Sequence, residues 1–169
     1  MPEPLYPAPL ALDPAWTADT IAVQAGRPAR VPGAPMNAPI TLSSTYVHDA
    51  TLEYGRDGNT SWGALEAALG ALDGGQAVTF ASGLAAVTAI ADLVPAGGTV
   101  VLPTVAYFGV RNIFERMQAA GRLTVRLVAA DDTAAVLAAA EGADMVWMES
   151  IANPLIVVAD VPAITAGAR

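Results

Sequence analysis

Three short apolar stretches alternate with stretches of helical periodicity in the second half of this chain. The apolar stretches cover residues 100–102, 124–128 and 145–148, and the helical stretches between them cover residues 110–120 and 132–140. Apolar runs without polar alternation are typical of strands that are buried on both faces. The pattern therefore predicts an α/β fold whose mostly parallel sheet has helices on both faces.

A tight turn precedes this alternation. Residues 78–80 have the composition of a short buried strand, Ser82 and Gly83 form a turn, and an alanine-rich helix follows over about residues 83–93. The first N–H groups of a helix lack partners within it and lie at the positive end of its dipole. Ser82, Gly83 and Leu84 are therefore candidate ligands of a phosphate. The structural alternative is that Ser82 only caps the helix and Gly83 only turns the chain.

The first part of the chain is rich in proline, with nine of the 13 prolines among the first 50 residues. Proline extends neither a regular helix nor a central strand. We expect an irregular arm with a short helix around residues 17–25 and some strand character at 41–46; a flexible terminus is the alternative. Apolar residues recur at helical spacing over 61–72. We therefore divide the chain into an arm, 1–60, and an α/β domain, 61–169.

Composition excludes several classes of function. The chain has 169 residues, is 54% hydrophobic and carries a formal net charge of −8, so we expect a folded domain without a basic surface for nucleic acid or anionic lipid. It has no cysteine, which excludes disulfides, thiolate metal sites and cysteine nucleophiles, and no metal site is predicted. No apolar stretch is long enough to cross a membrane, and the start lacks the layout of a secretory signal. We expect a cytoplasmic protein.

Aromatic and polar side chains follow the ends of the predicted strands. Tyr107 follows the first strand of the alternation, and Glu149 and Asn153 follow the third. Ligands of open parallel sheets bind beyond the carboxyl ends of the strands, so these residues can converge with Ser82 on one site. Tyr107 could stack on a planar ligand or simply close a loop. Glu149 could orient its neighbours or cap a strand, and a buried carboxylate there would need a donor.

A further candidate pair, Tyr54 and Arg56, lies in a polar stretch that favours a turn. A guanidinium suits phosphate oxygens in charge and geometry, and a tyrosine hydroxyl can donate beside it. The alternative is a surface arginine that pairs with Asp57.

These motifs occur together in an order that resembles the cystathionine gamma-synthase and gamma-lyase family, the pyridoxal-phosphate enzymes of cysteine and methionine metabolism. The resemblance runs from about Asp19 to the end of the chain and implies the amino-terminal portion of a fold type I large domain. The motifs that carry it are Tyr54-Gly55-Arg56 with Asn59, Leu65-Glu66, Asp73-Gly74-Gly75, Phe80-Ala81-Ser82-Gly83, Tyr107, Glu149-Ser150 and Asn153-Pro154.

The resemblance implies pyridoxal 5'-phosphate as the cofactor and gives each motif a role. Ser82, Gly83 and Leu84 would bind its phosphate, Tyr107 would be the catalytic residue that stacks on its ring, and Asn153 would bond its phenolic oxygen.

The resemblance also implies that Glu149 belongs to the wall of the cofactor site. Tyr54 and Arg56 would bind the cofactor phosphate of an adjacent subunit, so the arm would make a homo-oligomer. The implied activity is that of a C–S lyase or gamma-replacement transferase of transsulfuration, with a small sulfur-containing or O-acylated amino acid as substrate. Gamma-synthase, gamma-lyase and beta-lyase stay open.

All eight basic residues are arginines, so the chain has no lysine. Pyridoxal enzymes bind their cofactor through a lysine amine, and a protonated guanidinium does not replace it. We therefore expect an incomplete chain that is inactive alone. One alternative is a non-catalytic fragment that binds cofactor phosphate or assembles with full-length subunits. A phosphate-binding domain of another class is less favoured, because neither Gly-x-Gly-x-x-Gly nor Gly-Lys-Ser/Thr occurs.

Overall fold

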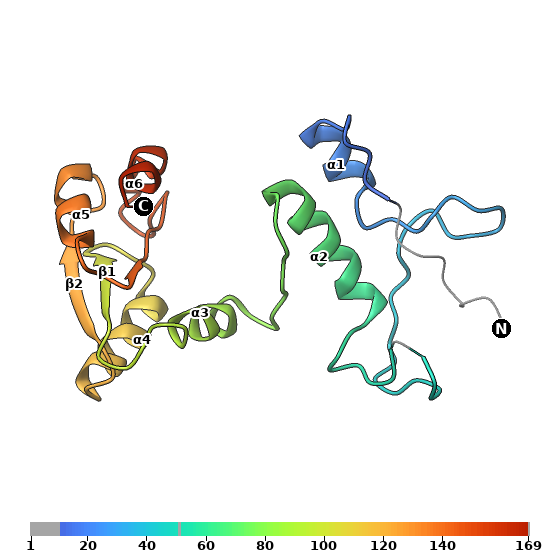
Figure 1. Ribbon diagram of the computed structural model, residues 1–169, viewed down its shortest axis with the longest axis horizontal. Helices are drawn as coiled ribbons and strands as arrows, with labels where there is room; N and C mark the ends of the chain where they lie inside the picture. Colours follow the sequence, from blue (N-terminus) through green and yellow to red (C-terminus); the bar gives the residue numbers. More distant parts are fainter. Residues whose placement is uncertain (1–10, 51, 169) are drawn as a thin grey trace. The chain divides into compact units, whose positions relative to one another are not determined.

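The computed structural model describes residues 11–50 and 52–168, so the first ten residues of the predicted arm lie outside the described residues. The chain divides into two compact units, Met1–Thr79 and Phe80–Arg169, named the amino-terminal and carboxyl-terminal units (Figure 1). The helix expected at the start of the α/β domain belongs to the amino-terminal unit. That residues 1–60 act as an arm toward a neighbouring subunit stays a prediction.

The amino-terminal unit contains two helices that contact each other, α1 (Ala18–Gln24) and α2 (Thr60–Asp73), both close to their predicted bounds. Thr17 caps α1, and α2 ends where Gly74 adopts a left-handed conformation at φ 69°. The chain after α1 turns at Gly26 (φ 75°), whose backbone lies so close to the Ala64 carbonyl that a Cβ would not fit.

The strand expected at residues 41–46 does not form. The segment has a single antiparallel bridge, between Thr45 and Tyr54. Its carbonyl groups are instead bound by the side chain of Asn59, which is 7% exposed and donates to the carbonyls of Thr41 and Ser43 at 3.1 and 3.2 Å. A side-chain amide therefore satisfies groups that would otherwise need a neighbouring strand.

The carboxyl-terminal unit contains a three-stranded sheet in the order β2-β1-β3, with both pairings parallel, as the alternation predicts. Its strands are β1 (Thr99–Pro103), β2 (Thr124–Val128) and β3 (Met145–Val146). β3 is shorter than the predicted 145–148, although the N–H of Trp147 still donates to the Val101 carbonyl at 2.9 Å.

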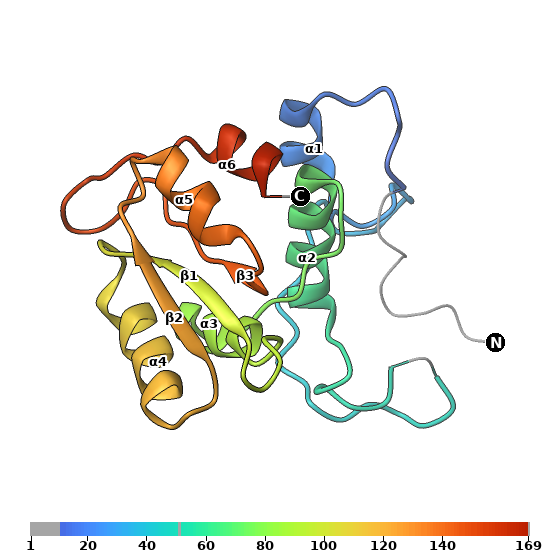
Figure 2. The same cartoon turned by 60° about the vertical axis from the view of Figure 1, so that its left-hand side comes forward.

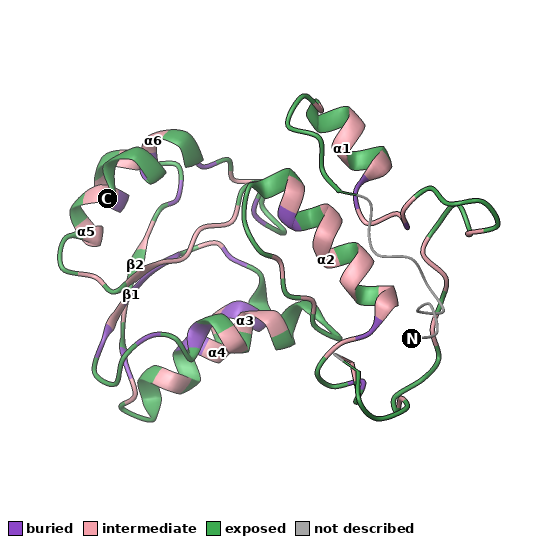
Figure 3. Cartoon of the chain, turned by 45° about the vertical axis from the view of Figure 1, so that its right-hand side comes forward, coloured by how far each residue is buried: buried purple, intermediate pink, exposed green. Residues whose placement is uncertain are grey.

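Helices cover both faces of this sheet (Figure 2). On one face, α3 and α4 enclose Val100, Leu102 and Phe114, all fully buried; on the other, α5 and α6 enclose Val136 and Ile164. Buried residues follow β1 and the inner side of α4 in Figure 3. The helices are α3 (Gly83–Ala91), α4 (Phe108–Ala119), α5 (Thr133–Ala140) and α6 (Val161–Gly167).

The prediction of a buried strand at residues 78–80 is wrong. Val78 is 72% exposed and Phe80 is 46% exposed, and neither belongs to a strand. A strand needs a neighbour to bind its backbone groups, but β1 already pairs on both edges and no described strand pairs with this segment. The Glu66 carboxylate instead accepts from the N–H and the hydroxyl of Thr79, at 2.8 and 2.9 Å.

Over residues 11–50 and 52–168, we find no helix with the length and apolar character that crossing a membrane requires.

Candidate cofactor site

A cavity of about 490 Å³ lies beside the turn that begins α3. Its volume falls within the roughly 300–1,000 Å³ that is usual for small-molecule sites. Five of the residues predicted for a cofactor site share its wall with three residues that were not predicted. The lining residues are Ser82, Gly83, Leu84, Val87, Tyr107, Val110, Trp147 and Glu149.

The turn at Ser82 has the geometry of a helix cap. Ser82 is extended (φ −158°, ψ 158°), and its Oγ accepts from the N–H of Ala85 at 3.2 Å. The structural alternative for Ser82 is therefore present, and it does not exclude a ligand. Within the described residues, the N–H groups of Gly83 and Leu84 donate to no protein acceptor. Space is open where a Cβ would stand on Gly83, so an anion could approach these two groups.

Tyr107 is the N-cap residue of α4 and is 39% exposed. Its ring lies close to the backbone of Gly109: a Cβ on Gly109 would stand 2.7 Å from Tyr107 Cε1 and 2.8 Å from Leu84 Cδ2. Only glycine avoids this overlap. The position of the ring against Leu84 therefore depends on Gly109, a residue that the sequence did not single out.

Glu149 is half-buried and has two donors. Its Oε2 accepts from the backbone N–H of Tyr107 at 2.8 Å, and its Oε1 accepts from the Trp147 indole N–H at 3.3 Å. The donor that a carboxylate at this position was expected to need is therefore present. Trp147 also meets the ring of Phe114 edge-on at 5.7 Å. Its place two residues before Glu149, at the carboxyl end of β3, is the signal that could have identified it.

Three predicted residues lie outside this cavity. Asn153 is exposed, in a turn between the bridged residues Ala152 and Val157. Tyr54 and Arg56 belong to the amino-terminal unit, where the Arg56 guanidinium carbon lies 5.0 Å from the centre of the Tyr54 ring.

The alternative for Arg56, an ion pair with Asp57, is wrong. Among the described residues, no salt bridge joins the two side chains. Arg56 is exposed and stacks on an aromatic ring, an arrangement that leaves guanidinium N–H groups available to an anion.

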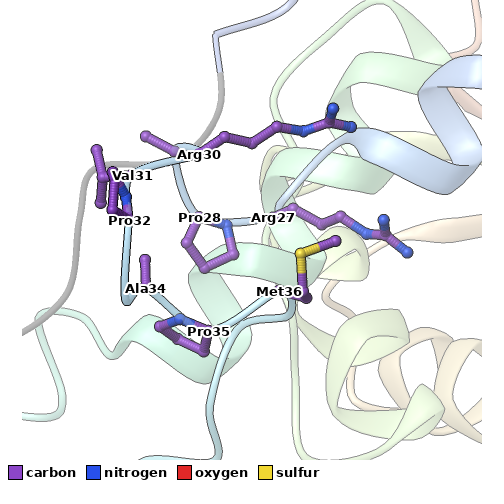
Figure 4. A pocket seen from close by; sticks show the side chains of 9 residues that line it. Arg27, Pro28, Arg30, Val31, Pro32, Ala34, Pro35 and Met36 are labelled. Atoms are coloured by element: carbon purple, nitrogen blue, oxygen red, sulfur yellow. The ribbon is translucent and has the colours of Figure 1, made fainter.

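A separate cavity of about 410 Å³ lies in the amino-terminal unit, within the proline-rich loop of residues 27–36 (Figure 4). The side chains of Arg27 and Arg30 extend in the same direction, and the Arg30 guanidinium donates to Gln24 Oε1 at 3.0 Å. None of the residues predicted for the cofactor site lines this cavity.

Comparison with known proteins decides the family. The family model described as Cys/Met metabolism PLP-dependent enzyme matches residues 19–169. The chain belongs to this family.

Relatives that catalyse two different reactions are similar to this chain. Cystathionine gamma-lyase of Rattus norvegicus is 35% identical over 132 residues, 74% of this chain and 33% of the rat protein. Cystathionine gamma-synthase of Mycobacterium tuberculosis is 36% identical over 155 residues, 86% of this chain and 40% of that protein.

Solved structures of family members match as well. The cystathionine gamma-lyase of Micromonospora echinospora matches with a TM-score of 0.80 and 30% identity, over 90% of this chain and 42% of that chain. The cystathionine gamma-synthase of Xanthomonas oryzae pv. oryzae, in complex with cystathionine, matches with a TM-score of 0.75 and 27% identity, over 90% of this chain and 43% of that chain. The sheet is therefore part of a fold type I architecture, and the chain spans less than half the length of these relatives.

Proposed function

We propose that this chain provides the phosphate-binding turn and the ring-facing wall of a pyridoxal-phosphate enzyme of transsulfuration, of the cystathionine gamma-lyase or gamma-synthase type. The observation that carries the proposal is the convergence of five predicted residues on one cavity. The residues are Ser82, Gly83, Leu84, Tyr107 and Glu149. They come from the start of α3, the start of α4 and the chain after β3, as expected for a site beyond the carboxyl ends of parallel strands.

The turn fits a phosphate in its donors and in its space. The N–H groups of Gly83 and Leu84 have no acceptor among the described residues, and nothing lies within 4 Å of the Cβ position of Gly83. α3 adds the positive end of its dipole, which contributes about 0.3–1 kcal/mol toward a nearby anion. The Ser82 hydroxyl can donate to the same anion while its oxygen continues to cap the helix.

The opposite wall fits a planar ring. Tyr107 offers an aromatic face in a half-exposed position, and Gly109 admits its ring against Leu84. When bound, pyridoxal phosphate supplies an electron-poor ring that stabilises charge at the α carbon of an amino acid. The role of Tyr107 is to hold the cofactor ring in one plane and to exclude water from the ring face that it covers.

Three further residues complete the proposed site. Asn153 would donate to the phenolic oxygen of the cofactor. Tyr54 and Arg56 would serve the cofactor phosphate of a second subunit, so we propose that the active assembly is a homo-oligomer. The stacked Tyr54–Arg56 pair supports this role because it fixes the guanidinium while leaving it exposed.

The proposed substrate is a small sulfur-containing or O-acylated amino acid. This rests on the relatives, which are named for cystathionine, and on a solved gamma-synthase that contains it. The chain is about equally identical to a gamma-lyase and to a gamma-synthase, so we propose only the substrate class that the two enzymes share.

The absence of lysine has a direct consequence for activity. No amine in these 169 residues, apart from the amino terminus, can take the place of the lysine side chain. We therefore expect the purified chain to release no product from cystathionine, as measured by thiol and keto-acid formation; turnover would contradict this.

The absence of lysine also favours a second candidate function, a non-catalytic chain that binds cofactor phosphate or assembles with complete subunits. Formation of hetero-oligomers on mixing with a complete homologue would support it.

The binding half of the proposal is tested by Gly83→Val. The space at Gly83 accepts a side chain, so the fold should survive while the route of the phosphate is blocked. Titration with pyridoxine 5'-phosphate, which carries the ring and the phosphate but no aldehyde, should show binding to the natural chain and at least a tenfold loss in the variant. Gly63→Val is the matched control, because Gly63 also faces open space but lies in α2. Equal binding by both variants would overturn the proposal.

A further inference from the structure

The Glu149 carboxylate connects two segments that are distant in sequence. Oε2 accepts from the backbone N–H of Tyr107, 42 residues earlier, at 2.8 Å, and Oε1 accepts from the indole of Trp147 at 3.3 Å. One oxygen therefore holds the loop that follows β1, and the other holds the end of the chain that continues β3. Both hydrogen bonds are made within the protein, so the carboxylate already has its partners without a ligand.

The bond to Tyr107 supplies something that α4 lacks. Many helices begin with a capping box, in which a glutamate at the third helical position accepts from the N–H of the N-cap residue. In α4 the N-cap residue is Tyr107, whose side chain makes no capping bond, and the third helical residue is the apolar Val110. Glu149 makes the missing bond from outside the helix, and its negative charge lies at the favourable end of the helix dipole.

We infer that Glu149 is a positioning residue, which fixes the ring of Tyr107 in the cavity by holding its backbone. Gly109 leaves room for the ring, and the ring of Phe108 packs on it with 4.7 Å between the ring centres. Glu149 determines the position of the Tyr107 backbone. The effect on ring binding rests on the proposed function, whereas the effect on Tyr107 itself does not.

The first test measures amide hydrogen exchange at Tyr107 in the ligand-free chain. Glu149→Ala removes both acceptors, and hydrogen bonds to a charged group contribute enough that exchange should accelerate about 10- to 100-fold. Glu149→Gln keeps one acceptor oxygen and has an NH2 donor in place of the other. The exchange rate of the Tyr107 amide in this variant should therefore lie between the rates in the natural chain and in Glu149→Ala. Glu115→Ala is the matched control: Glu115 also lies on α4 but pairs with Arg111 at 2.7 Å. Unchanged exchange at Tyr107 in both Glu149 variants would overturn the inference.

The second test separates positioning from general loss of structure. Titration with inorganic phosphate measures binding at the Ser82 turn alone. Titration with pyridoxine 5'-phosphate measures binding at the turn and against the Tyr107 ring together. Glu149→Gln should leave the affinity for inorganic phosphate within twofold and weaken pyridoxine 5'-phosphate by about fivefold or more. An equal loss for both probes, or no loss for either, would contradict positioning. If the natural chain binds neither probe, the proposed function fails, and hydrogen exchange at Tyr107 still decides the inference.

Discussion

The carboxyl-terminal unit contains both clusters of buried apolar side chains found among the described residues, whereas the buried polar side chain, Asn59, lies in the amino-terminal unit. In the first case, a parallel sheet packs between helices, and burial of apolar surface supplies the stability. In the second, side chains bind the backbone of irregular loops: the Asn59 Nδ2 lies within hydrogen-bond distance of the carbonyls of Thr41 and Ser43 and also of the Tyr46 hydroxyl. Loss of a buried apolar side chain should therefore destabilise the carboxyl-terminal unit most, and loss of a hydrogen-bonding side chain should destabilise the amino-terminal unit most.

The largest effect should follow from Phe114→Ala. Phe114 of α4 is fully buried in the apolar cluster with β1, and its ring contacts Trp147. Its loss should destabilise the carboxyl-terminal unit by about 3–5 kcal/mol, from lost transfer energy and an unfilled cavity. Denaturant unfolding of the variant measures this. Phe108→Ala is the matched control: Phe108 is 67% exposed and pairs with the Tyr107 ring at 4.7 Å, so its removal should cost only about 0.5–1.5 kcal/mol. A loss for Phe114→Ala as small as that for the control would mean that the apolar cluster does not stabilise this unit.

A smaller effect, in the other unit, should follow from Asn59→Ala. The variant removes the cap of α2 and leaves the Thr41 carbonyl without its side-chain donor, which together should cost about 2–3 kcal/mol; the Ser43 carbonyl still accepts from the Tyr46 hydroxyl at 3.2 Å. Hydrogen exchange should accelerate in α2 and stay unchanged in β1. Asn59→Asp sharpens the test, since the aspartate keeps the oxygen that caps α2 and loses only the amide donor. Acceleration in β1 as well would show that the two units are not stabilised separately.

The smallest effect on stability should follow from Gly109→Ala. The added methyl group would stand 2.7 Å from the Tyr107 ring, so the ring must move, at a cost of about 1–2 kcal/mol. Binding of pyridoxine 5'-phosphate should weaken by more than binding of inorganic phosphate. Gly63→Ala is the control, since a methyl group there meets nothing within 4 Å and should raise helix stability by about 0.5–1 kcal/mol. Unchanged NMR shifts of the Tyr107 ring and unchanged affinity would contradict the role of Gly109.

Local signals predicted most of the carboxyl-terminal unit. Capping by Ser82 was one of its two expected roles, and its Oγ accepts from the N–H of Ala85, three residues on. Apolar runs predicted all three strands of the sheet. β1 is buried along most of its length, as such a run implies, whereas the edge strand β2 is exposed at Thr124, Arg126 and Leu127.

The failures share one physical cause. The segments at 41–46 and 78–80 have strand-like composition, but whether a strand forms depends on a neighbour that composition does not reveal. In both segments a distant side chain binds the backbone instead: Asn59 in the first and Glu66 in the second. Similarly, neither the close approach of Gly109 to Tyr107 nor the bond from Tyr107 to Glu149 follows from spacing, because each depends on the packed positions of separate elements.

The most direct measurement of the central claim is a chemical-shift titration of the backbone amides with pyridoxine 5'-phosphate. We predict that the amides of Gly83 and Leu84 shift first and most, that Tyr107 shifts with them, and that inorganic phosphate shifts only the first two. Shifts confined to the loop that contains Arg27 and Arg30, or no saturable shift at Gly83 and Leu84, would contradict the assignment of this turn as the phosphate site.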